Sequence, residues 1–126
     1  MSGTRFLLNT NFILAILNEQ EPVIQMMSSR SIDDADCDYS AIARIELLSF
    51  PSITSQDINV IEDFLSRLHY IPLSSEIENK TILIRRQYKL KLPDAIIAAT
   101  AKCLNLELLT LDRQSANRMQ EIVRDK

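Results

Sequence analysis

The sequence predicts one α/β domain over residues 1–126, a three-layer α/β/α sandwich with a small, mainly parallel sheet of four to five strands. Short apolar segments that suit strands alternate with longer segments whose apolar residues recur at helical spacing. Strands separated by helices need crossover connections, which pair the strands in parallel and place helices on both faces. The chain has the usual length of one domain, and 46% of its residues are apolar, which is enough for a core.

The individual elements follow from apolar spacing and from capping and breaking residues. Ser40 suits the N-cap of a helix, Pro22 suits a first helical turn, and Pro51 stops the helix before it. The expected strands are residues 5–8, 37–39, 69–71 and 107–111. The expected helices are residues 12–17, 21–30, 41–48, 54–68, 75–88, 92–104 and 114 onward.

The composition excludes several classes of site. The only glycine is Gly3, so the glycine-rich loops that cradle nucleotide phosphates cannot be built, and we expect no nucleotide cofactor. A single histidine and the lack of a Cys-x-x-Cys motif exclude the common zinc sites. The net charge of −3 shows no basic footprint, which counts against a stable nucleic-acid-binding module. It counts less against a nuclease, because an acidic metal site itself adds negative charge.

The sequence also predicts a cytoplasmic location. Its apolar runs reach only about ten residues, too few to cross a bilayer, and the first residues do not form a signal peptide. Cys37 and Cys103 are expected to be free thiols in a reducing compartment.

Polar side chains follow the predicted strands, at the edge where open parallel sheets bind ligands. Asn9 and Asn11 follow the first strand, and Asp112 follows the last. Glu46 lies in the helix after the second strand, and Asp94 lies at the start of the Ala-rich helix. Carboxylates that share a cleft repel one another unless a cation neutralises them, and oxygen ligands without His or Cys suit Mg²⁺ or Mn²⁺. A cation bound by such a set can activate a water and stabilise the charge that develops on a phosphodiester.

Each acid also has a structural explanation that the spacing leaves open. Asp94 follows Pro93 at a helix start, where the helix dipole favours an acid. Asp112 suits a turn before the last helix. Glu46 lies at the edge of an expected apolar stripe, a common place for a surface residue as well. That stripe consists of Ile42, Ile45 and Leu48.

Four segments, in order, resemble the PIN domain family. Residues 6–14, Phe-Leu-Leu-Asn-Thr-Asn-Phe-Ile-Leu, resemble its opening, where a strand ends in Asp-Thr-Asn. Residues 40–48, with a Glu-Leu pair near the end, resemble the second segment. Residues 92–101, Leu-Pro-Asp-Ala-Ile-Ile-Ala-Ala-Thr-Ala, are similar to the third and most specific segment, and residues 108–112, Leu-Leu-Thr-Leu-Asp, to the fourth. The resemblance covers essentially the whole chain.

The resemblance implies a Mg²⁺- or Mn²⁺-dependent endoribonuclease, most often the VapC-type toxin of a toxin–antitoxin pair. It also implies an RNA substrate, a homodimer, and a cognate antitoxin that covers the active-site groove. The catalytic and metal-binding set would be Asn9, Glu46, Asp94 and Asp112. The groups that orient ligands or substrate would be Thr10, Asn11, Ser40 and Thr110. Three basic residues lie near these acids in the sequence: Arg86 and Lys91 precede Asp94, and Arg113 follows Asp112. They are either solvated surface residues or contacts for the RNA backbone.

Asn9 departs from the family pattern, which has Asp at this position. An amide offers an oxygen but no charge, and it cannot act as a base. Three accounts are open: a change engineered to silence a toxic enzyme, a natural weakened member, or a site that works with the remaining acids. We expect impaired cleavage, and the second hypothesis is a non-catalytic PIN-fold module that binds a partner or RNA.

Overall fold

The computed structural model describes residues 4–124, without the side chains of residues 113–116. The described residues form a four-stranded sheet in the order β3-β2-β1-β4, with every pairing parallel. The strands are β1 (Phe6–Leu8), β2 (Cys37–Ser40), β3 (His69–Ile71) and β4 (Glu107–Leu109). The helices are α1 (Thr10–Leu17), α2 (Glu21–Ser29), α3 (Ala41–Leu48), α4 (Ser55–Leu65), α5 (Ser75–Gln87), α6 (Leu92–Leu104) and α7 (Arg113–Arg124), with a 3-10 turn at Asp34–Asp36. The predicted α/β class and parallel sheet are confirmed.

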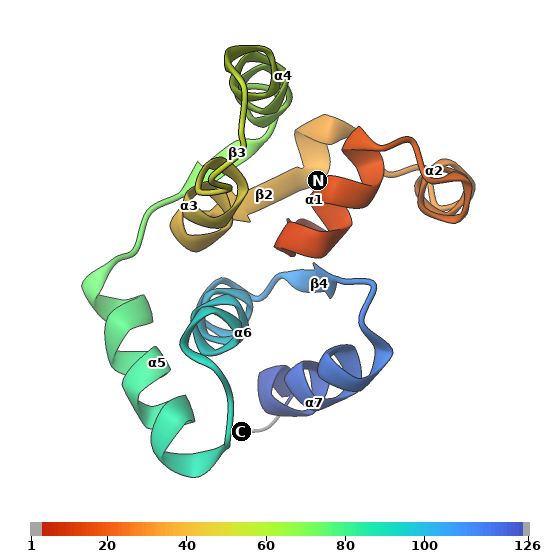
Figure 1. Cartoon of the computed structure of the whole chain (residues 1–126). Coiled ribbons are helices and arrows are strands. Elements are labelled where there is room, and N and C mark those ends of the chain that lie inside the picture. Colours follow the sequence, from red (N-terminus) through yellow and green to blue (C-terminus); the bar gives the residue numbers. More distant parts are fainter. Residues whose placement is uncertain (1–3, 125–126) are drawn as a thin grey trace.

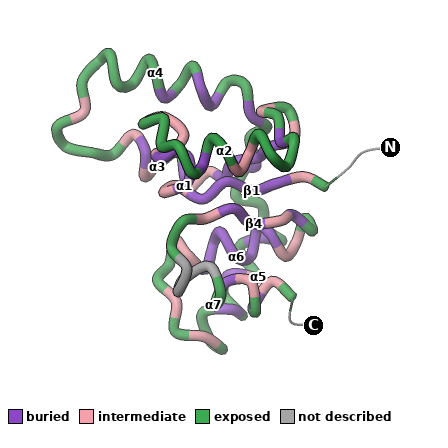
Figure 2. The backbone as a smooth tube through the Cα atoms, turned by 90° about the vertical axis from the view of Figure 1, so that its right-hand side faces the viewer, coloured by how far each residue is buried: buried purple, intermediate pink, exposed green. Residues whose placement is uncertain are grey.

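Helices cover both faces of the sheet. In β1 the side chains alternate, so Phe6 and Leu8 pack in a cluster with residues of α1 to α4, and Leu7 packs in a second cluster with residues of α5 to α7. Figure 1 shows these two groups of helices on opposite sides of the strands. Figure 2 shows that buried residues concentrate in the strands and on the inner faces of the helices. The sandwich thus has two cores separated by one small sheet.

Local signals explain where the helices begin and end. The Asn9 side chain accepts a hydrogen bond from the Thr10 N–H at the start of α1, and Ser40 caps α3 through the N–H groups of Ile42 and Ala43. Helix α6 starts after Lys91 with a proline in its first turn. It ends at Leu104 and is capped by Asn105, whose φ of 56° is a left-handed conformation that asparagine tolerates.

Two sequence-based expectations need correction. The last strand ends at Leu109 and not at Leu111, because the Leu111 N–H donates to the Asn11 side chain and not to a neighbouring strand. The expected apolar stripe of α3 is also wrong: Ile45 is 58% exposed, whereas Ala43 and Leu47 are buried in the first core. Helix α3 is therefore turned from the expected orientation.

Candidate active site

The sheet topology places a crevice at the carboxyl ends of β1 and β4. β1 lies between β2 and β4, and the connections from these strands run to helices on opposite faces of the sheet. In parallel α/β sheets, ligands bind at such a switch point because the diverging connections leave the strand ends open. Asn9 directly follows β1, and Thr110 directly follows β4.

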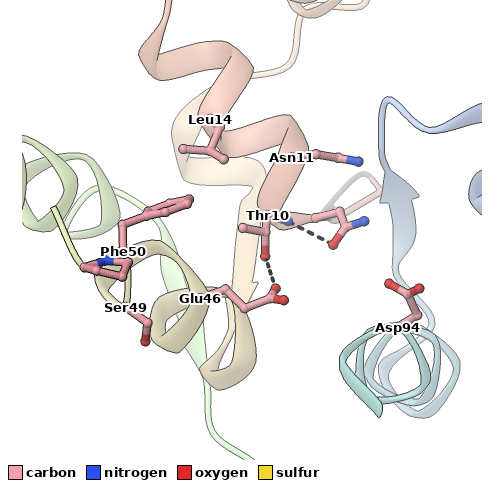
Figure 3. Close-up of a pocket in the computed structure, with 9 residues that line it drawn as sticks. Thr10, Asn11, Leu14, Glu46, Ser49, Phe50 and Asp94 are labelled. Atoms are coloured by element: carbon pink, nitrogen blue, oxygen red, sulfur yellow. Dashed lines mark hydrogen bonds between the residues drawn. The ribbon is translucent and has the colours of Figure 1, made fainter. Parts of the chain in front are cut away.

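A cleft of about 510 Å³ opens at this point. Its polar lining comes from the start of α1, from Glu46 on α3 and from Asp94 on α6. Figure 3 shows the Glu46 and Asp94 carboxylates directed toward the space between these three helices. The full lining is Asn9, Thr10, Asn11, Leu14, Glu46, Ser49, Phe50, Pro51 and Asp94.

The Glu46 carboxylate is oriented by a hydrogen bond from another helix. The Thr10 hydroxyl donates to Glu46 Oε1 at 2.6 Å, which joins the first turn of α1 to α3. The Thr10 N–H in turn donates to Asn9 Oδ1 at 2.9 Å. The 2.6 Å bond from the Thr10 hydroxyl to the Glu46 carboxylate is charge-assisted, and such short bonds are among the stronger hydrogen bonds in proteins. Glu46 is therefore held at the cleft and not free on the surface of α3.

A second set of hydrogen bonds joins the ends of β1 and β4. Asn9 Nδ2 donates to Thr110 Oγ1 at 3.1 Å, and the Thr110 hydroxyl lies 3.2 Å from Asn11 Oδ1. The Leu111 N–H donates to the same Asn11 oxygen at 3.3 Å. Asn9 is only 8% exposed, so its amide groups depend on these protein partners.

Asp94 carries the clearest electrostatic signature of the cleft. Partial burial raises the pKa of Asp94, the nearby carboxylates of Glu46 and Asp112 raise it further, and the ammonium of Lys91 opposes them. Asp112 is exposed, shortly after the end of β4, yet its charge reaches Asp94. An acid in a cleft whose pKa is raised by burial and by neighbouring carboxylates is a common feature of functional sites.

The donor set fits a weakly held hard cation. Carboxylate, amide and hydroxyl oxygens suit Mg²⁺ and Mn²⁺, and Mg²⁺ often takes only one or two carboxylates and keeps several waters. Within residues 4–124 as described, no three His, Cys, Asp or Glu side chains are grouped closely enough to hold a metal by themselves. A carboxylate in place of Asn9 would add one acid to Glu46 and Asp94 at the same cleft.

Three other predicted site residues, Ser40, Arg86 and Lys91, do not line the cleft. Ser40 is 2% exposed and lines a separate small pocket with Ile42 and Thr100, so it does not face the acids. Arg86 is exposed near the end of α5, and Lys91 is exposed just before α6 and near Asp94. The side chain of Arg113 is outside the described part of the chain.

The apolar part of the cleft was not predicted from the sequence. Leu14 and Phe50 line it and also line an adjoining groove of about 400 Å³ between α1 and α4. Phe50 is 48% exposed although it is a large aromatic residue. The signal available in the sequence was a Phe-Pro pair directly after an α-helix, where an apolar side chain is left on the surface.

No helix within the described residues has the length and apolar character needed to span a bilayer.

Comparison with solved structures shows the same fold in toxin–antitoxin complexes. The chain is 28% identical, with a TM-score of 0.73, to a chain of the toxin–antitoxin complex from Klebsiella pneumoniae, and the match covers 86% of this chain and 88% of that one. DNA-bound VapBC from Salmonella typhimurium matches at 22% identity and a TM-score of 0.77 over 93% of both chains. The structure of VapBC2 from Rickettsia felis bound to a DNA fragment from its promoter matches at 21% identity and a TM-score of 0.77. That match covers 91% of this chain and 92% of the other. The latter two likenesses show the fold alone.

A comparison with curated proteins finds no match. The family model described as the PIN domain matches residues 6–121, which include all four strands and the whole cleft. This chain belongs to the PIN domain family.

Proposed function

We propose that this chain is the toxin of a toxin–antitoxin pair, a PIN-domain endoribonuclease whose cleavage is weakened by Asn9. The observation that supports it most is the arrangement of the cleft, where Glu46 and Asp94 come from different helices and face one space at the carboxyl end of β1. The similarity to a chain of a toxin–antitoxin complex supports the biological setting.

In the proposed reaction the side chains of this cleft hold the cation and the RNA. Glu46, Asp94 and Asp112 would be the charged ligands, and the Asn9 oxygen, which already accepts from Thr10 N–H, would add a neutral one. Bound Mg²⁺ or Mn²⁺ supplies an activated water and neutralises the charge that develops on the phosphodiester. Thr10 keeps Glu46 directed into the cleft. Because the pKa of Asp94 is raised, its carboxylate form becomes dominant at a higher pH than that of an ordinary aspartate.

The deciding experiment restores the missing charge. We expect Asn9→Asp to raise Mn²⁺-dependent cleavage of a mixed RNA by about 10–100-fold, the scale on which metal sites respond to changes around their ligands. Asp94→Asn in the same background serves as the matched control and should abolish the gain. If Asn9→Asp cleaves no RNA and binds no Mn²⁺ by calorimetry, the enzyme proposal is wrong.

A second candidate function, partner binding without catalysis, is favoured by the apolar groove. Leu14 and exposed Phe50 join the cleft to the groove beside α4, a surface suited to an apolar segment of an antitoxin. Co-purification with the product of the neighbouring gene tests this. Phe50→Ala should weaken the complex, whereas Leu104→Ala, an exposed leucine on α6 outside the groove, should not. A complex that survives Asp94→Ala, with no cleavage in any variant, would favour binding as the sole function.

The proposal also includes RNA contacts, a homodimer and a cytoplasmic setting. Arg86 and Lys91 are exposed, and Lys91 lies near Asp94, so they and Arg113 are candidates for the RNA backbone. Charge reversal at Lys91 should weaken RNA binding and reduce its dependence on salt. The family resemblance supports the homodimer, which light scattering would test directly.

A further inference from the structure

The directions of the hydrogen bonds around Asn9 are fixed by the backbone. Asn9 Oδ1 accepts from the Thr10 N–H, which can only donate, so Nδ2 must be the atom that faces Thr110. Asn11 Oδ1 likewise accepts from the Leu111 N–H, so the Thr110 hydroxyl must donate its proton to that oxygen. Thr110 therefore accepts from Asn9 and donates to Asn11, and its one proton is used.

We propose that the Asn9–Thr110–Asn11 chain is a clasp that holds the carboxyl ends of β1 and β4 together beside the cleft, with Thr110 as its positioning residue. The clasp ties the start of α1 to the segment after β4 and, through the Leu111 N–H, fixes the backbone directly before Asp112. Asn9 therefore has a structural role of its own, because its amide nitrogen donates a hydrogen bond to Thr110 that a carboxylate cannot donate.

A carboxylate at position 9 would break this chain. The Asn9→Asp side chain would present an oxygen where the amide nitrogen stands, and Thr110 has only one proton to share between that oxygen and Asn11. Without metal, either the new carboxylate or Asn11 loses its bond to Thr110. Because Asn9 is 8% exposed and Glu46 and Asp94 line the same cleft, the added charge would also be poorly solvated and repelled.

The clasp is tested on the whole protein in EDTA, with no RNA present. In the ¹⁵N spectrum, the Asn9 side-chain NH₂ should exchange slowly in the wild type, lose this protection in Thr110→Val, and keep it in Thr110→Ser. Asn9→Asp in EDTA should lower Tm by roughly 3–8 °C. Addition of Mg²⁺ should raise the Tm of Asn9→Asp by more than it raises the Tm of the wild type, because the added carboxylate gives the cation a charged ligand.

Each readout can overturn the clasp. It is wrong if the Asn9 NH₂ exchanges at the rate of an unprotected amide, if Thr110→Val leaves its signal unchanged, or if Asn9→Asp matches the wild-type Tm in EDTA. Should Asn9→Asp fail to fold, the exchange measurements on the wild type and the two Thr110 variants still decide. A failure to cleave RNA would leave these results unaffected, so the clasp and the proposed ribonuclease function are tested separately.

Discussion

Removing the Thr10 hydroxyl should both destabilise the protein and release Glu46. Thr10→Val keeps the shape and volume of the side chain, and it leaves intact the backbone bond from Thr10 N–H to Asn9. What disappears is the 2.6 Å bond from the hydroxyl to Glu46 Oε1, the direct link between the first turn of α1 and α3 at the cleft.

The size of the effect follows from the charge and exposure of this pair. A hydrogen bond to a charged group contributes about 1.5–3 kcal/mol. Both side chains are half-buried at the edge of an open cleft, so water can solvate the Glu46 carboxylate that is left behind. We therefore expect a loss of about 1–1.5 kcal/mol, at or just below the lower end of that range. For a chain of this length, that corresponds to a decrease in Tm of roughly 3–7 °C.

Thermal unfolding in EDTA, followed by circular dichroism, measures this change. Thr10→Ser is the matched control and should retain most of the wild-type Tm. A double-mutant cycle with Glu46→Met, which has no oxygen acceptor, isolates the bond, because the two changes should be non-additive when each removes the same interaction. If Thr10→Val unfolds at the wild-type temperature, or if the two substitutions are additive, the Thr10–Glu46 hydrogen bond does not stabilise the fold.

The other predictions concern the rest of the fold. Arg5→Met should cost about 2–3 kcal/mol in chemical denaturation, because the 3%-exposed Asp38 carboxylate loses its guanidinium partner and keeps a contact to exposed His69 at 3.4 Å. Arg30→Gln breaks the ion pair with Glu107, in which the two side chains are 42% and 37% exposed, and should cost at most about 1 kcal/mol. Equal costs for Arg5→Met and Arg30→Gln would show that burial of the carboxylate does not set the cost. Burial raises the pKa of Cys37 to about 12, so at pH 8 iodoacetamide should modify half-buried Cys103 in the folded protein and Cys37 only after unfolding. Rapid modification of Cys37 under native conditions would show that β2 opens readily.

The alternation of apolar strands and periodic helices was enough to predict the class, because parallel pairing follows from crossover connections. The end of the first strand was also predictable, because Asn9 is a polar residue directly after an apolar run, whereas the last strand ends at Leu109, two residues earlier than the apolar run before Asp112 indicated. The spacing of Asp94 was compatible both with an acid that stabilises a helix start and with a metal ligand. In the structure Asp94 lines the cleft together with Glu46.

What the sequence could not supply depends on side-chain direction. The exposed position of Ile45 follows from how α3 packs between two cores, which apolar periodicity alone does not determine. The polarity of the clasp follows from which atoms the backbone N–H groups of Thr10 and Leu111 approach, and a sequence contains no such information. The exposure of Phe50 likewise depends on the groove formed by α1 and α4, two segments distant in the chain.

We propose that the cleft at the carboxyl ends of β1 and β4 is a cation site, with Glu46 and Asp94 as its lining carboxylates and Asp112 as a charged group near Asp94. Mn²⁺ broadens the NMR signals of nuclei near its binding site, so a titration of the ¹⁵N-labelled protein locates that site directly. Amide signals at residues 9–11, 46, 94 and 110–112 should broaden first, and Asp94→Asn should suppress the effect. Broadening centred elsewhere, or an equal response in Asp94→Asn, would show that the cation does not bind at this cleft.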